Sequence, residues 1–194
     1  MSSAPASYPV TVEFDGPSPQ SRLTVFFRIV MVIPHAIVLY ALGIAQQVVA
    51  IIAWFAILIT GKYPAGLYGF SVGVLRWQAR VNAYAYLLTG VYPPFALDES
   101  PGYTARLRVV EQLENRNRLT TFFRLFMLIP HVIVLYLIGI AATIVLIIAW
   151  FVALFTAQVP PGMHNFLAGT LRWSLRVNAY GLLLTDEYPP FSLS

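Results

Sequence analysis

The chain has 194 residues, of which 58% are hydrophobic and only 10% are charged, far below the roughly 25% charged residues of soluble domains. This composition excludes an ordinary soluble globular domain and predicts an all-α integral membrane protein. The formal net charge of +4, set beside so much apolar sequence, favours anionic headgroups of membrane lipids over nucleic acid as partners. The absence of cysteine excludes thiolate metal sites and disulfides, and we expect no metal, cofactor or catalytic residue.

An internal duplication organises the chain. Residues 22–95 align with residues 118–191 without gaps, and 44 of the 74 aligned positions are identical. The repeat divides the chain into an N-terminal extended segment (1–21), a first membrane repeat (22–95), a cytoplasmic linker with a strand (96–117) and a second membrane repeat (118–194). The relation between such repeats decides the topology of a membrane protein.

A short strand is predicted ahead of each repeat. Apolar residues alternate with polar ones over 8–14 and again over 103–109, which is the period of a half-buried strand. A single strand is not stable alone, so we expect the two strands to pair with each other on the cytoplasmic side of the membrane.

A short apolar helix then opens each repeat, at 23–33 and at 119–129. At about 1.5 Å per residue it is too short to cross a bilayer, so we expect it to lie at the membrane interface. Pro34 and Pro130 follow and predict a break or a kink, because proline disfavours helix in the residue before it.

Two longer helices complete each repeat. Residues 36–60 and 132–156 carry no charge over about 37 Å of helix, enough to cross a hydrocarbon layer of about 30 Å. Residues 67–89 and 163–185 form the second pair, which carries arginines near its middle and ends before the motif YPPF. The sequence therefore predicts four transmembrane helices, arranged as two tandem hairpins.

The charge pattern favours parallel hairpins with both termini and both strands in the cytoplasm of a multi-pass cell-membrane protein. Under this topology the side opposite the cytoplasm carries only Lys62 as a basic residue, whereas the cytoplasmic side is rich in arginine, as the positive-inside rule requires. The cytoplasmic arginines are Arg22, Arg28, Arg106, Arg108, Arg116, Arg118 and Arg124. An alternative divides residues 23–60 into two crossings at Gly43, which gives three crossings per repeat and inverted repeats.

The arginines of the fourth segment lie on one face of its helix, together with small residues. In the first repeat this stripe contains Gly69, Gly73, Arg76, Arg80 and Tyr84, and small residues there permit close helix approach. An arginine in mid-bilayer costs at least about 2.5–3.5 kcal/mol. No acidic residue lies in an apolar segment, so compensation must come from backbone carbonyls, water, a bound anion or the acidic linker.

These arginines predict a site for a lipid phosphate or another anion, because paired guanidinium groups match phosphate oxygens. The neighbouring tryptophans would flank the bound group, and the asparagines would orient it. The candidate residues are Arg76, Arg80, Arg172, Arg176, Trp77, Trp173, Asn82 and Asn178. The alternative is that the helices lie obliquely, that the arginines extend to the headgroups, and that nothing specific binds.

His35 and His131 each follow a proline in apolar surroundings. A histidine pair can bind a metal or relay protons. We favour a structural role, because no acid or cysteine joins either histidine at ligand spacing.

With these motifs laid out, the chain resembles an uncharacterised bacterial membrane family, domain of unknown function 4389, in two tandem copies. The resemblance is carried by RLTVFFR, IPHAIVLY, IIAWFAILITGKYP, LRWQARVNAY and YPPF, with their counterparts in the second copy. It implies an integral membrane protein and transfers no catalytic residue.

Three functions remain open. The favoured one is a non-enzymatic scaffold or accessory subunit that contacts lipid headgroups, a larger membrane complex or further copies of the chain. The second is a small oligomeric transporter or channel that uses the paired arginines for anions or lipid phosphates. The third, a lipid-modifying enzyme with His35 or His131 as base, lacks a residue to orient either histidine.

Overall fold

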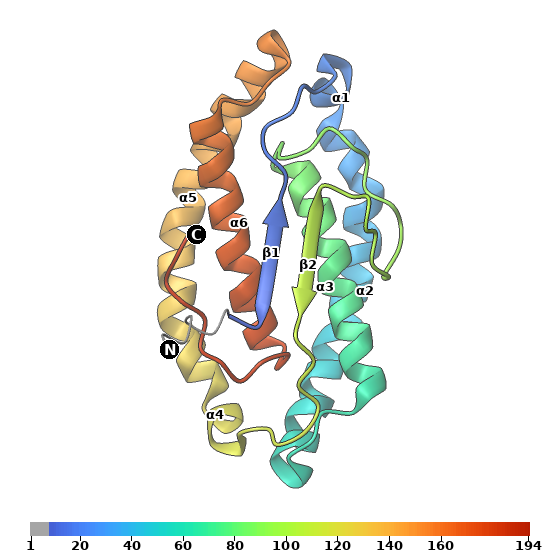
Figure 1. Ribbon diagram of the computed structural model, residues 1–194, viewed down its shortest axis with the longest axis vertical. Helices are drawn as coiled ribbons and strands as arrows, with labels where there is room; N and C mark the ends of the chain where they lie inside the picture. The colour runs from blue at the N-terminus through green and yellow to red at the C-terminus, as the bar shows by residue number, and fades with distance from the viewer. Residues whose placement is uncertain (1–7) are drawn as a thin grey trace, which may run out of the picture.

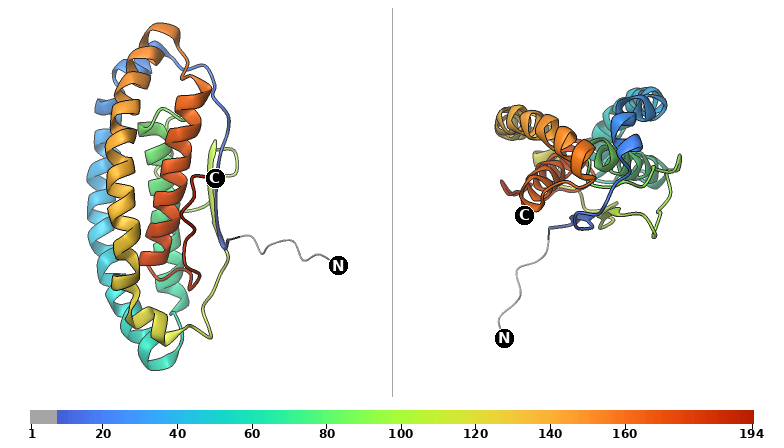
Figure 2. Two further views of the ribbon diagram at one scale, coloured as in Figure 1. Left: turned by 90° about the vertical axis from the view of Figure 1, so that its left-hand side faces the viewer. Right: turned by 90° about the horizontal axis from the view of Figure 1, so that it is seen from above.

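The computed structural model describes residues 8–194, which form six helices and two strands in three layers (Figures 1 and 2). Two long helices make the first layer, two shorter helices the second, and a two-stranded ribbon the third. The elements in chain order are β1 (Val10–Phe14), α1 (Arg22–Phe26), α2 (Arg28–Thr60), α3 (Ala65–Ala85), β2 (Ala105–Val109), α4 (Arg118–Phe122), α5 (Arg124–Thr156) and α6 (Pro161–Gly181).

The two strands pair with each other, as expected. β1 and β2 are antiparallel, and Val12 lies opposite Leu107, its own equivalent in the alternating pattern. Equivalent strands that pair in this way are related by a pseudo-two-fold axis perpendicular to the ribbon, through the Val12–Leu107 pair. Each repeat is therefore turned by half a revolution relative to the other.

The prediction of parallel hairpins is wrong for this reason. α2 runs from the end of the molecule that holds α1 toward the end that holds α4, and α5 runs back in the opposite direction (Figure 1). The turn of each repeat meets the start of the other: Gln20 N donates to Ala157 O at 2.8 Å, and Arg116 N donates to Gly61 O at 3.0 Å. The charge count that favoured parallel hairpins treated all the arginines as lying at one end, whereas the fold distributes them.

The ribbon runs alongside α3 and α6, along the length of these helices (Figure 2). Its inner face is apolar and packs on these two helices, and its outer face carries Thr11, Glu13, Arg106 and Arg108. Antiparallel ribbons with one buried face show this alternation.

The prediction of a break at Pro34 and Pro130 is also wrong. α2 and α5 continue through these prolines, and the boundary with the short helices lies earlier, at Phe27 and Phe123. A proline inside a helix costs about 3 kcal/mol, so the surroundings must hold the helix on both sides. In α2 these anchors are Arg28 and His35, which are both buried.

Tryptophans join the two repeats. Trp54 Nε1 donates to Thr121 O in α4, and Trp150 Nε1 donates to Val25 O in α1, both at 2.9 Å. The end of each long helix is thereby fixed to the short helix of the other repeat.

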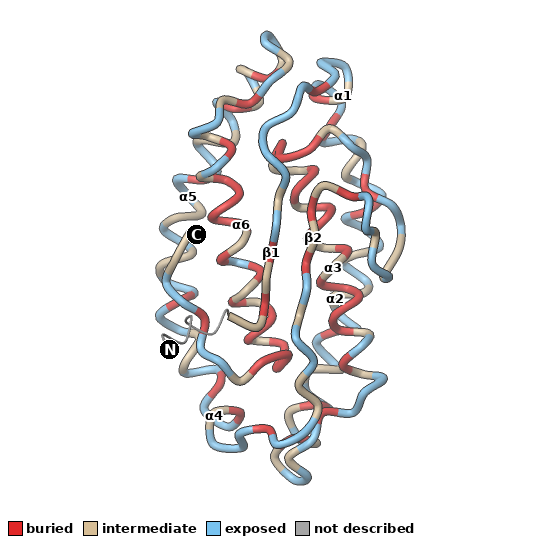
Figure 3. The backbone as a smooth tube through the Cα atoms, in the orientation of Figure 1, coloured by how far each residue is buried: buried red, intermediate tan, exposed pale blue. Residues whose placement is uncertain are grey.

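The long helices present apolar side chains outward. Exposed Ile, Leu, Val and Phe side chains follow α2 from Ile29 to Ile59 and α5 from Leu125 to Phe155, whereas α3 and α6 hold most of the buried residues (Figure 3). The only charged residue in each long helix, Arg28 or Arg124, is buried. Among the helices of residues 8–194, α2 and α5 alone are long and apolar enough to cross a membrane, and the structure therefore supports two candidate spans where four were predicted.

The ends of α2 and α5 provide a matched stability test. Gly61 and Ala157 both adopt the left-handed conformation, with φ of 72° and 62°. Glycine adopts this conformation without steric cost, whereas the Cβ of alanine makes it unfavourable. We expect Ala157→Gly to raise the free energy of unfolding by about 0.5–1 kcal/mol and Gly61→Ala to lower it by a similar amount. Thermal unfolding in detergent micelles measures both, and an opposite ordering would contradict the expectation.

Candidate anion site

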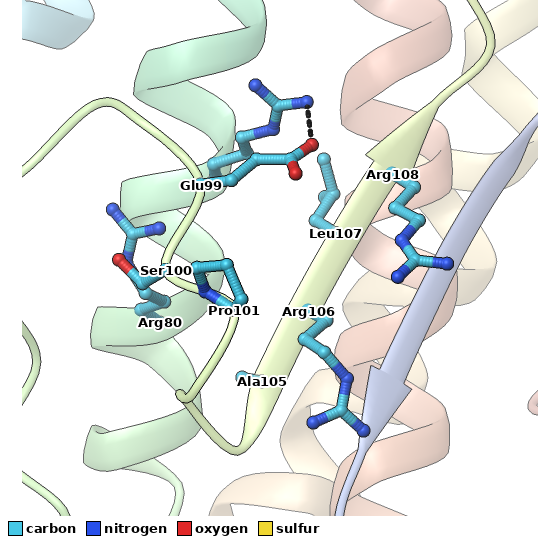
Figure 4. Close-up of a pocket in the computed structure, with 9 residues that line it drawn as sticks. Arg80, Glu99, Ser100, Pro101, Ala105, Arg106, Leu107 and Arg108 are labelled. Carbon is cyan, nitrogen blue, oxygen red and sulfur yellow. Dashed lines mark hydrogen bonds and ion pairs between the residues drawn. The ribbon is translucent and has the colours of Figure 1, made fainter.

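Two of the predicted arginines line a small pocket beside α3 and β2, together with two arginines of β2 (Figure 4). Its volume is about 80 Å³, and Arg76 and Arg80 line it from α3, whereas Arg106 and Arg108 line it from β2 with their side chains directed toward β1. The lining is completed by Glu99, Ser100, Pro101, Ala105 and Leu107. Glu99 pairs with Arg76, and Glu13 and Asp15 pair with Arg106, so four guanidinium groups against three carboxylates leave a small excess of positive charge, which suits an anionic group.

Linker atoms compensate the two α3 arginines. Arg76 Nη2 pairs with Glu99 Oε1 at 2.6 Å, and Arg80 donates to the carbonyls of Asp98, at 3.0 Å, and of Ala96. Two of the sources of compensation considered from the sequence, the acidic linker and backbone carbonyls, thus both stabilise the charges of these arginines. Arg80 Nε and Arg76 Nε are buried without a hydrogen-bond partner.

Arg172 and Arg176 lie apart from this pocket, on the other side of the pseudo-two-fold axis. Arg172 donates from Nε to Val12 O at 2.9 Å and from Nη1 to Leu193 O at 3.0 Å. Arg176 Nη1 donates to Ser194 O at 2.7 Å. The four predicted arginines therefore form two pairs, one beneath each strand, and only the first pair lines the pocket.

Trp77 and Trp173 do not flank the arginines. Each points toward the long helix of its own repeat, where Trp77 Nε1 donates to His35 Nδ1 and Trp173 Nε1 to His131 Nδ1, both at 3.2 Å. Each histidine is fully buried, and the phenylalanine of YPPF stacks on its ring with centroids about 4 Å apart. A ring nitrogen that accepts from an indole must be unprotonated, so each histidine is neutral and enclosed.

Asn82 and Asn178 also lie outside the pocket. Asn178 Nδ2 donates to Gln78 Oε1 at 3.2 Å, which joins α6 to α3 near the centre of the molecule. Both asparagines are half-buried. The predicted set of eight residues thus separates into arginine pairs toward the ribbon, tryptophan–histidine pairs toward the long helices, and an asparagine contact between α3 and α6.

Comparison with known families gives one assignment. The model of Domain of unknown function (DUF4389) matches residues 22–96 and again residues 118–192. The chain belongs to this family, in two tandem copies. No curated protein and no solved structure matches the chain.

The most deeply buried charges of the DUF4389 repeats were missed from the sequence. In the second repeat Asp186 pairs with the side chains of Arg116 and Arg124, each at 2.8 Å, and Arg124 lies 3.9 Å from the centroid of the Tyr180 ring. Both guanidinium groups are almost fully buried. Burial alone would raise the pKa of Asp186, but hydrogen bonds from Arg116 and from Asn117 N, with the charges of both arginines, outweigh burial and lower it.

The first DUF4389 repeat holds its buried arginine differently. Gly90 stands where the second repeat has Asp186, and Gln20 stands where it has Arg116, at the same offset of 96. Relative to the second repeat, the first repeat therefore lacks one positive charge, at Gln20, and one negative charge, at Gly90. The loss of both members of a possible ion pair indicates that the two positions are in contact. This paired difference between the repeats could have revealed the buried ion pair from the sequence. In the structure, Gln20 lies beside Gly90.

Proposed function

We propose that this protein is a non-enzymatic membrane module that lies in one leaflet with α2 and α5 parallel to the bilayer plane and presents the ribbon to the aqueous phase as a scaffold or accessory surface. The observation that carries this proposal is the two-sided character of the molecule. Exposed apolar side chains cover the layer of α2 and α5, and exposed charged side chains, among them Glu13 and Arg108, cover the ribbon layer opposite.

The position of the ribbon favours this orientation over upright helices. If α2 and α5 stood along the bilayer normal, the ribbon beside α3 and α6 would lie at the depth of the acyl chains. Glu13, Asp15 and Arg106, which form an ion-pair cluster on the outer face, would then meet hydrocarbon. Each such charge costs at least about 2.5–3.5 kcal/mol, whereas a helix layer parallel to the membrane leaves all of them in water.

Headgroup contacts follow at the two ends of the molecule. Arg22 and Arg118 are exposed beside α1 and α4, whose phenylalanines are also exposed. Aromatic rings and arginines at the edge of an apolar layer suit the headgroup region of a bilayer. Both repeats would meet the membrane at equal depth, since the pseudo-two-fold axis is then parallel to the bilayer normal.

A binding role for the arginine pocket is supported by its charge and its location. Arg76, Arg80, Arg106 and Arg108 lie on the aqueous side in this orientation, where they would bind an anionic group of a partner or a soluble anion. An enzymatic role for His35 or His131 gains no support, because tryptophan and phenylalanine rings enclose both imidazoles.

Labelling of single cysteines tests the orientation, and the natural chain has no cysteine to interfere. Lys62 and Gln158 are equivalent, exposed residues in the two hairpin turns, at opposite ends of the long axis. We expect Lys62→Cys and Gln158→Cys to react with an impermeant maleimide from the same side of the membrane. Ile44→Cys, on the apolar face, is the unreactive control. Reaction of the two turns from opposite sides would overturn the in-plane orientation.

A second function is favoured by the same arginine pocket. If several copies stood upright with their ribbons facing one another, the ribbons would line a polar pathway rich in arginine, as an anion channel requires. Opposite-side labelling of the two turns, together with anion flux in liposomes that Arg76→Ala reduces, would support this alternative. Same-side labelling without flux would exclude it.

A further inference from the structure

Arg28 is a buried cation without a counter-ion. Its side chain is 2% exposed and donates to Tyr84 O at 2.6 Å, to Thr89 O at 2.7 Å and to Gln20 Oε1 at 2.7 Å. These acceptors are neutral, and no carboxylate within residues 8–194 lies at ion-pair distance from Arg28. Its Nε is buried without a hydrogen-bond partner.

The second repeat shows what the first one lacks. Arg124, the equivalent of Arg28, has the carboxylate of Asp186 at 2.8 Å. In the first repeat Gly90 occupies the position of this aspartate and offers no side chain. A buried charge whose partner is missing is strongly unfavourable, so an anion from outside the chain would be held tightly there.

An apolar cavity of about 270 Å³ adjoins this arginine. It lies between the start of α2, the end of α3 and the C-terminal half of α5, and its lining is almost entirely apolar. Besides Arg28 it is lined by Ile29, Ala85, Leu87, Leu146, Ile147 and Trp150. Ile29 and Ile147 are exposed on the apolar face, so the cavity opens onto the layer of α2 and α5.

We propose that this cavity binds an anionic lipid, with a carboxylate or phosphate oxygen at the guanidinium of Arg28 and an acyl chain between α2 and α5. An arginine in the lining of an otherwise apolar cavity matches a molecule with one anionic end and a long apolar body. We expect the site at Arg28 and not at its equivalent Arg124, because Asp186 already neutralises Arg124. The proposal rests on the membrane association proposed above only for the source of the ligand.

The repeat itself supplies the variants. Gly90→Asp transfers the aspartate of the second repeat to the first and would neutralise Arg28 internally. A Cβ at Gly90 meets Gln20 Cγ at 3.4 Å, an ordinary contact, and the backbone has no positive φ there. Gly90→Asn adds a side chain of the same shape without charge, so it separates electrostatic from steric effects.

Tryptophan fluorescence reports binding, because Trp150 lines the cavity. The purified full chain in non-ionic detergent is titrated with a fatty acid brominated in its acyl chain, and parallel titrations use brominated phosphatidylglycerol and the uncharged brominated fatty alcohol. Bromine quenches a tryptophan that it contacts. Trp150→Phe removes the reporter at this site, and Trp54→Phe removes the equivalent tryptophan of the first repeat, which does not line the cavity.

We expect saturable quenching by the anionic probes that depends on Trp150 and not on Trp54. Gly90→Asp should weaken binding about 10- to 100-fold, the value of a charge-assisted hydrogen bond, and Gly90→Asn should bind as the natural chain does. Whichever anionic probe binds more tightly, the fatty acid or the phospholipid, identifies the preferred headgroup as a carboxylate or a phosphate.

Three results would overturn the proposal: equal quenching by the fatty alcohol, unchanged binding in Gly90→Asp, or equal loss of binding in Gly90→Asp and Gly90→Asn. Circular dichroism and gel filtration verify that each variant is folded. The titration is independent of orientation in the bilayer, so its failure and a failure of the labelling test are distinguishable.

Discussion

Asp186→Asn is expected to lower the free energy of unfolding by about 3–5 kcal/mol, because it leaves two buried guanidinium groups without their carboxylate. Arg116 and Arg124 are both almost fully buried, and Asp186 also accepts from Asn117 N at 2.8 Å. The substitution therefore weakens the junction between the linker, α5 and the end of α6. Thermal unfolding in detergent micelles should show a fall in Tm on the order of 10 °C.

The exposed ion pair between Lys62 and Glu114 is the control. Its atoms are 2.7 Å apart, no farther than in the pairs of Asp186, but both side chains are more than half exposed, and exposed pairs contribute little. We expect Glu114→Gln to leave Tm unchanged within error. Similar losses in the two variants would show that burial does not determine the contribution of these pairs.

The same carboxylate predicts a dependence on pH. Because the folded protein lowers the pKa of Asp186, its contribution is complete above the unfolded pKa of about 3.9 and is lost as the pH falls through the folded value. The difference in stability between the natural chain and Asp186→Asn should therefore be constant near neutral pH and should shrink below about pH 4. A difference that grew on acidification would contradict the assignment.

Gly169→Ala is expected to cost about 1–3 kcal/mol through overpacking. A Cβ at this position would lie 2.6 Å from Leu193 O and 2.9 Å from Leu193 Cβ, so the C-terminal segment would have to move. Arg172 Nη1 donates to the same carbonyl, and its hydrogen bond would be lost with the displacement. Thermal unfolding measures the loss, and limited proteolysis should show faster cleavage near Leu193.

Substitutions of two other glycines test whether close packing causes this loss of stability. Gly73, the equivalent of Gly169, would place its Cβ 3.0 Å from Leu97 Cβ, so Gly73→Ala should destabilise less. Gly69, one turn away, has nothing within 4 Å, and Gly69→Ala should stabilise α3 by up to about 1 kcal/mol. If Gly69→Ala destabilised as much as Gly169→Ala, close packing would not be the cause.

The sequence was sufficient for the features that depend on local pattern. Alternation over 8–14 and 103–109 predicted both strands and their pairing, and the uncharged runs predicted helices long enough to cross a membrane. Small residues beside the arginines predicted the close approach of another helix, and this prediction is wrong in its partner. The neighbour at Gly73 and Gly169 is the extended chain at Leu97 and Leu193 and not a second helix.

What the sequence could not provide was the relation between distant segments. Parallel and antiparallel repeats contain the same helices, and the choice depends on the direction in which β1 pairs with β2, which no single repeat encodes. The location of Arg28 in the interior likewise depends on Tyr84 and Thr89, which are more than 50 residues away. The pocket residues Arg106 and Arg108 were counted as linker charges, because nothing local indicated that β2 covers α3.

The half-turn that relates β1 to β2 also bears on how such a chain arises. Several contacts that join the repeats occur twice, as Trp54 with α4 and Trp150 with α1 illustrate. A single strand-plus-repeat unit thus contains both halves of its own interface, and two identical units would satisfy it as a symmetric homodimer. Gene fusion of such a dimer removes the dependence of assembly on concentration and frees the halves to diverge, as Gly90 and Asp186 have done.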